Sequence, residues 1–169
     1  MTAKELQNRI RMVLSFFIIA LVVSGLTAIP LQWELRLISR LISTSTLPSV
    51  MPNLAIWIEQ IYVGLEETFT QYPFIAYGTD WLAFGHIAIA IAFIGAFINP
   101  QKNLWVIDFG MIACVLVVPW ALVFGALRSI PFFWRLIDCS FGVFGFIPLW
   151  TCRSWVLRLR VIAPADPRL

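Results

Sequence analysis

The sequence predicts an all-α integral membrane protein, a bundle of four transmembrane helices with two amphipathic interfacial helices between the first and second spans. Apolar runs of about 18 residues, nearly the length needed to cross a hydrocarbon core, recur four times along the chain. The chain is 60% hydrophobic and only 12% charged, and its mean hydropathy is +0.87. These values lie far from those of soluble globular domains, so we expect one membrane domain over residues 1–169.

The first expected span covers residues 12–29 and is closed by Pro30. Lys4, Arg9 and Arg11 precede it in a short basic leader, which gives the N-terminus the look of a signal peptide. The apolar run is long for a signal peptide, and no small-x-small cleavage site follows it. We therefore expect an uncleaved first span.

Residues 31–78 are expected to form an extracytoplasmic amphipathic segment. In residues 31–43, Leu31 and Leu35 begin an apolar stripe that Ile38 and Ile42 continue at helical spacing, while the basic side chains Arg36 and Arg40 lie opposite. This pattern is typical of a helix that lies in the membrane interface, and the segment is too charged to cross the membrane.

A second amphipathic helix is expected over residues 54–70, after a Ser/Thr/Pro-rich loop at 43–53. Its apolar stripe is Leu54, Ile58, Ile61 and Leu65, and its acidic residues are Glu59, Glu66 and Glu67. The acidic helix either pairs with the basic helix before it, or the two charged faces are solvated independently.

The remaining spans are expected over residues 80–98, 104–127 and 136–152. Tyr72, Pro73 and Gly78 predict a turn into the second span, and NPQKN at 99–103 predicts a tight loop after it. Residues 128–135 read as a short aromatic loop, and a basic tail follows residue 152.

The distribution of basic residues predicts the orientation. With both termini in the cytoplasm, eight of the twelve basic residues lie on the inner side, as the positive-inside rule requires. These are Lys4, Arg9, Arg11, Lys102, Arg153, Arg158, Arg160 and Arg168.

Five ionisable residues are candidates for one polar cluster in the outer leaflet: Asp80, His86, Arg128, Arg135 and Asp138. Ionisable groups at membrane depth are costly unless paired, hydrated or neutral, which makes them functional candidates. Histidine suits proton sharing because its ordinary pKa lies near neutrality. The alternative is structural: Arg135 and Asp138 neutralise each other, and His86 donates a hydrogen bond to a neighbouring helix.

Small residues at Gly85, Ala88, Ala92 and Ala96 form a face on the second span. Such faces let helices approach closely in lipid, and we expect Gly142 and Gly145 of the fourth span to provide the partner surface. This packing would draw His86 toward Asp138.

Asp108 is a second candidate site, separate from the cluster, and a local ion pair with Lys102 is its simplest role. The three cysteines, Cys114, Cys139 and Cys152, lack metal-ligand spacing and are expected to act as small buried hydrophobes. We expect no metal and no cofactor.

Three stretches, YGTDWLAFGHIAIA, NLWVIDFGMIACV and IPFFWRLIDCSFGVFG, lie between Tyr72 and Arg153. Here the chain resembles small uncharacterised four-span bacterial membrane proteins. The resemblance covers roughly the C-terminal half, implies a bacterial inner-membrane location and implies no activity.

Two functional hypotheses from different classes follow. The first is a non-catalytic accessory or scaffold subunit of a membrane complex, with membrane lipids and other membrane subunits or further copies of itself as partners. The second is a lipid-site enzyme or proton-linked carrier that uses Asp80, His86 and Asp138. No phosphate-binding loop, nucleophile elbow or zinc-protease motif is present, and the charge pattern predicts no nucleic-acid binding.

Overall fold

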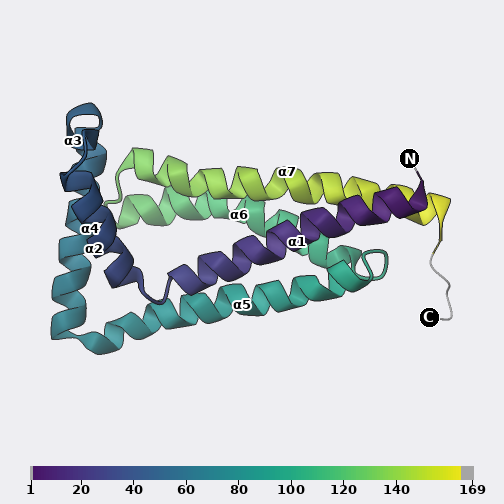
Figure 1. Ribbon diagram of the computed structural model, residues 1–169, viewed down its shortest axis with the longest axis horizontal. Coiled ribbons are helices and arrows are strands. Elements are labelled where there is room, and N and C mark those ends of the chain that lie inside the picture. The colour runs from purple at the N-terminus through teal and green to yellow at the C-terminus, as the bar shows by residue number, and fades with distance from the viewer. Residues whose placement is uncertain (1, 165–169) are drawn as a thin grey trace. The chain divides into compact units, whose positions relative to one another are not determined.

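The computed structural model describes residues 2–164, and all regular structure in this part of the chain is helical (Figure 1). The elements in order are α1 (Ala3–Thr27), α2 (Leu31–Ser43), α3 (Leu47–Val50), α4 (Pro52–Gln71), the 3-10 helix η1 (Pro73–Ala76), α5 (Tyr77–Ile98), α6 (Leu104–Leu127) and α7 (Phe132–Ile162).

Within the described chain, four helical segments are long and apolar enough to cross a membrane: α1, η1 with α5, α6 and α7. The expected count of four such helices is therefore confirmed. The bounds of α2 and α6 coincide with the expected segments 31–43 and 104–127.

The basic leader is helical and continuous with the first apolar run, because α1 begins at Ala3 and includes Arg9 and Arg11. A capping box starts the helix: the Glu5 amide donates to the Thr2 hydroxyl (3.3 Å), and the Thr2 amide donates to the Glu5 carboxylate (3.0 Å). The helix then continues without a break into the apolar run.

Two other boundaries differ from the expectation. Gly78 was expected in a turn, but α5 begins at Tyr77 and contains it. The fourth span was expected over residues 136–152, but α7 has 31 residues. That length corresponds to about 46 Å, longer than a hydrocarbon core of about 30 Å. Arg153, Arg158 and Arg160 therefore lie on the helix, whereas Arg168 lies outside the described residues.

The chain divides into two compact units, and α1 and α5 each contribute to both. The first unit combines Met1–Ala20 with Ala90–Leu169. Its apolar core is built from α1 residues at helical spacing, the last part of α5, and the facing sides of α6 and α7. The core side chains with almost no exposure are Leu6, Ile10, Leu14, Phe93, Ile107, Leu149, Cys152 and Val156.

In the first unit, α6 and α7 lie side by side as an antiparallel hairpin (Figure 1). A Cβ atom placed on Gly142 would lie 2.4 Å from the Cys114 carbonyl oxygen, and one on Gly145 would lie 2.7 Å from Cys114 Sγ. Gly85 of α5, by contrast, has no atom within 4 Å of such a position. Gly142 and Gly145 of α7 therefore pack on α6. The expectation that they pack on the small residues of α5 is wrong at these positions.

The connection between α6 and α7 is a Schellman motif. The Ile130 amide donates to the Gly125 carbonyl (2.9 Å), and the Ser129 amide donates to the Ala126 carbonyl (3.2 Å). Ser129 takes the left-handed conformation, with φ of 58°. This position is usually glycine, because a side chain there is strained.

The second unit is Leu21–Ile89, which contains α2, α3 and α4 together with the adjoining ends of α1 and α5. Of the expected α2 stripe, Leu31, Leu35 and Ile42 are half-buried but Ile38 is exposed, whereas Ile58 in the expected α4 stripe is buried. The loop expected at 43–53 contains the short helix α3, which Pro48 helps to start.

Candidate functional site

Asp108 of α6 and Arg153 of α7 form an ion pair in the first unit. Arg153 Nε donates to Asp108 Oδ1 at 2.5 Å, and the two side chains are 38% and 37% exposed, with Asp108 the slightly more exposed. Lys102 was the expected partner of Asp108, and this expectation is wrong. Because α7 continues as a helix beyond Cys152, Arg153 reaches α6 from the neighbouring helix instead of lying in a tail.

A groove of about 480 Å³ runs along the α6–α7 surface from this ion pair. Four apolar residues of α6 and one of α7 line it: Met111, Ile112, Val115, Leu116 and Phe146. With Asp108, the α6 residues follow helical spacing over two turns, about 12 Å. The site is thus apolar along its length and charged at one end.

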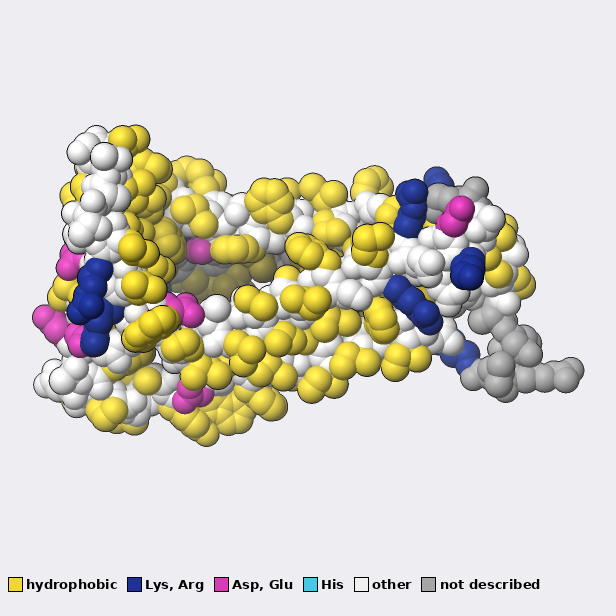
Figure 2. Space-filling view, in the orientation of Figure 1, with side chains coloured by type: hydrophobic (Ala, Val, Ile, Leu, Met, Phe, Trp, Pro, Cys, Tyr) yellow, Lys and Arg dark blue, Asp and Glu magenta, His cyan; other side chains and the backbone are white. Residues whose placement is uncertain are grey.

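The end of the first unit that holds this ion pair is strongly basic (Figure 2). Arg9 of α1 stacks over Trp155 of α7, 5.9 Å from the ring centroid. Arg160 donates to the Gln101 carbonyl, and Gln101 in turn donates to the Ala163 carbonyl at 3.0 Å. These contacts bring the start of α1, the loop before α6 and the end of α7 together.

The opposite end of the α6–α7 hairpin carries Arg128, Arg135 and Asp138. Arg135 Nε donates to the Ile130 carbonyl at 2.8 Å, and its guanidinium lies 5.7 Å from the Phe132 ring centroid. The ion pairs among the described residues do not include Asp138, so the expected neutralisation of Asp138 by Arg135 is not formed. Arg128 is exposed.

Asp80 and His86 both lie on α5, in the second unit. His86 Nδ1 lies 2.9 Å from the Leu82 carbonyl of its own helix, a contact in which Nδ1 is the donor because a carbonyl oxygen only accepts. The side chain packs beside Gly25 of α1, where a Cβ atom would lie 2.9 Å from His86 Cβ. His86 was expected to bond to a neighbouring helix, and the observed bond is to its own.

Asp80 is exposed and borders a hollow of about 240 Å³ with Tyr77, Trp81 and Phe84. Trp81 makes edge-on contacts with both other rings, at 5.9 Å and 5.5 Å between centroids. Since Asp80 and His86 belong to the second unit and the other three candidates to the first, the joint cluster stays a prediction.

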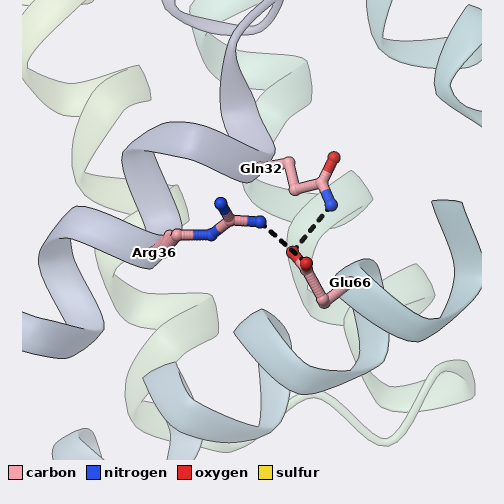
Figure 3. Close-up of polar contacts among 3 residues, drawn as sticks. All are labelled: Gln32, Arg36 and Glu66. Atoms are coloured by element: carbon pink, nitrogen blue, oxygen red, sulfur yellow. Dashed lines mark hydrogen bonds and ion pairs between the residues drawn. The ribbon is translucent and has the colours of Figure 1, made fainter. Parts of the chain in front are cut away.

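The second unit contains a polar cluster that joins α2 to α4 (Figure 3). Gln32 Nε2 donates to Glu66 Oε2, and Arg36 Nη2 donates to the other oxygen, Oε1, both at 2.7 Å. The hydrogen bond from Arg36 lowers the pKa of Glu66 below its ordinary value, and the same bond raises the pKa of Arg36. Ser39 also donates to Glu59. The expected pairing of the basic and acidic helices is therefore observed through Arg36, whereas Arg40 is exposed.

No group of three or more potential metal ligands is found between residues 2 and 164. Cys152 is buried, as expected of a small hydrophobe, while Cys114 and Cys139 are half-buried, and all three are free thiols. Comparison of the chain with protein families, curated proteins and solved structures gave no match.

Proposed function

We propose that this chain is a non-catalytic multi-pass membrane protein that acts as an accessory or scaffold subunit of a membrane complex. In this proposal the four apolar helices span a bacterial inner membrane with both termini in the cytoplasm, and α2 and α4 lie in the interface on the outer side. The positive-inside rule supports this orientation.

The observation that carries the proposal is an exposed apolar stripe on α2. Trp33, Leu37 and Leu41, spaced by four residues, have exposed fractions of 63%, 44% and 60%. The side of the helix turned toward α4 carries Gln32 and Arg36, which bond to Glu66. The exposed apolar stripe is therefore left for an external surface to cover.

The stripe is suited to bind a neighbouring membrane subunit because it combines a tryptophan with two leucines. The helix that carries it is held in place by its bonds to α4. Aromatic residues in the middle of an apolar patch are typical of the energetically important part of an interface. The bonds to Glu66 hold α2 in one orientation, so little ordering is required when a partner binds.

Site-specific photocrosslinking in intact membranes tests the proposal. A photoreactive residue at Leu37 should form a crosslink to one defined membrane protein or to a second copy of the chain. The matched control is Ser39, whose hydroxyl donates to Glu59 of α4 and which therefore lies on the side of α2 turned toward α4. Crosslinks from Leu37 to lipid alone would remove the subunit role while leaving the interfacial placement of α2 intact.

The alternative, a lipid-site enzyme or proton-linked carrier, is favoured by one observation. With Nδ1 donating to the Leu82 carbonyl, His86 presents Nε2 as a proton acceptor. A carrier of this kind should lose proton-coupled uptake in proteoliposomes when His86 is replaced by Gln and should retain its fold. Unchanged uptake would eliminate this alternative.

A further inference from the structure

We propose that the α6–α7 groove binds one glycerophospholipid, with an acyl chain along the apolar stripe and the phosphate on Arg153. The proposal rests on the membrane placement given above and is independent of the α2 surface. It concerns the groove lined by Met111, Ile112, Val115, Leu116 and Phe146.

The shape of the groove matches an amphipathic occupant with one polar end. Asp108 and Val115 are seven residues apart on α6, and Phe146 and Arg153 are seven apart on α7, so both pairs keep to one helix face over two turns. Because the helices are antiparallel, the ion pair marks one end of the groove and Phe146 with Val115 marks the other. An acyl chain requires such an apolar track beside the charged end.

Residues 2–164 leave the apolar track uncovered. Ile112, Val115 and Leu116 are 59%, 56% and 57% exposed, although they border a concave surface. In a bilayer the flexible acyl chains of the lipid fill such concave surfaces, whereas a neighbouring helix would need a complementary ridge.

The charge at the polar end favours a phosphate. A guanidinium has five N–H donors, and the ion pair with Asp108 uses only Nε of Arg153. The remaining donors form the planar fork that binds phosphate oxygens. Asp108 then acts as the group that orients Arg153 toward the groove.

The surrounding charges also favour an anionic headgroup. At this end of the first unit, the described basic residues outnumber the acidic residues Glu5 and Asp108 by seven to two. Those basic residues are Lys4, Arg9, Arg11, Lys102, Arg153, Arg158 and Arg160. Basic groups near a membrane surface attract anionic lipids.

A first experiment establishes that the protein is extracted from membranes by detergent. Native mass spectrometry of the full chain then tests the proposal. With added phosphatidylglycerol, the native protein should retain one lipid. Arg153→Ala should lower the retained fraction by about tenfold, as expected for the loss of charge-assisted hydrogen bonds. Leu116→Trp should lower it comparably by filling the apolar track.

Matched variants distinguish a specific lipid site in the groove from general attraction of anionic lipids to basic residues. Arg158→Ala removes an exposed charge from the same helix end without touching the groove and should leave retention unchanged. Asp108→Asn frees Arg153 from its ion pair and should retain the lipid. Equal losses in Arg153→Ala and Arg158→Ala would overturn the proposal, because lipid would then follow net charge alone.

Two further outcomes would also overturn it. If Arg153→Ala and Asp108→Asn both lose the lipid together with thermal stability, the ion pair is structural and not a headgroup site. If Leu116→Trp changes the oligomeric state instead of lipid retention, the groove is occupied by a second copy of the chain. If Arg153→Ala unfolds the protein, Arg153→Lys replaces it in the test. Lysine preserves the charge but lacks the planar fork of donors, so lipid retention should fall but not vanish.

Discussion

In the α6–α7 pair, two helix backbones meet where Gly142 faces the Cys114 carbonyl, whereas in the α2–α4 pair, polar side chains bridge the helices at Glu66. Each pair contains one arginine–carboxylate ion pair, and the two are similarly exposed. The helices around them differ: α6 and α7 are long and apolar enough to cross a membrane, whereas α2 is short and carries Glu34, Arg36 and Arg40.

This difference indicates which interactions hold each pair. Between apolar helices in lipid, no hydrophobic drive brings the helices together, so close packing at small residues has to supply the association. On a polar helix face, hydrogen bonds and ion pairs can do so, but they are weakened by water and salt. We therefore expect the two pairs to respond to different perturbations.

The largest effect is expected from Gly142→Ala. The added methyl group would lie 2.4 Å from the Cys114 carbonyl oxygen, so one helix must shift, at a cost of about 1–3 kcal/mol. Unfolding in detergent micelles, followed by circular dichroism, measures the loss. Gly85→Ala is the matched control, because it gains the same helix propensity in open space. Equal stabilities of the two variants would show that the close contact does not hold the hairpin.

A smaller effect is expected when Glu66 is protonated. Its pKa is lowered in the folded protein by the hydrogen bond from Arg36, so the stabilisation is fully present above the ordinary glutamate pKa of about 4.3. It is lost as the pH falls through the lower folded value. Because the pKa of Arg36 is raised, Arg36 stays charged throughout this acidic range, and Glu66 is the member of the pair that titrates.

Hydrogen exchange of α2 and α4 between pH 7 and pH 3 measures this loss, after correction for intrinsic exchange rates. Protection should fall in the acidic part of the range. Glu66→Gln should show weak protection at every pH and no such fall. A native-like fall in Glu66→Gln would assign the effect to other carboxylates.

Salt provides a still milder test of the comparison. At about 1 M NaCl the Debye length shrinks to about 3 Å, so the half-exposed pair of Arg36 and Glu66 should be weakened. We expect hydrogen exchange to increase modestly in α2 and α4 and to stay constant around Gly142. Faster exchange in both helix pairs would contradict the assignment of different forces to them.

The smallest effect is expected from Ser129→Gly, which should stabilise the α6–α7 turn by up to about 1 kcal/mol. Ser129 has φ of 58°, and glycine adopts this conformation without steric cost. Ser129→Ala is the control, because alanine keeps the strain, and it should give no gain. The two melting temperatures in the same detergent provide the comparison.

Local patterns in the sequence were sufficient to predict the helices but not their contacts. The bounds of α2 and α6 followed from Pro30, Asn103 and the apolar periodicity. The end of α7 was missed because the arginines after Cys152 resemble a tail. Trp155, Val156 and Leu159 continue the apolar pattern there and are the signal that would have extended the helix.

The pairing of Asp108 with Arg153 could not be read from the sequence. It depends on the rotation of two helices about their axes, which the contact between Gly142 and Cys114 fixes. Lys102 was closer in sequence and of the right charge. The pairing of α2 with α4 was easier to foresee, because the two helices carry opposite charges and follow one another along the chain, joined by one short segment.

The order of contacts along the α6–α7 hairpin has a consequence for how it assembles. Arg135 and Ile130 bond across 5 residues, Cys139 and Val118 across 21, Arg153 and Asp108 across 45, and Gln101 and Ala163 across 62. Each contact therefore closes only a modest extension of the loop closed before it, and the entropic cost of each step is small. The hairpin can therefore form from its turn outward, and α6 pairs with α7 without a slow search between distant parts of the chain.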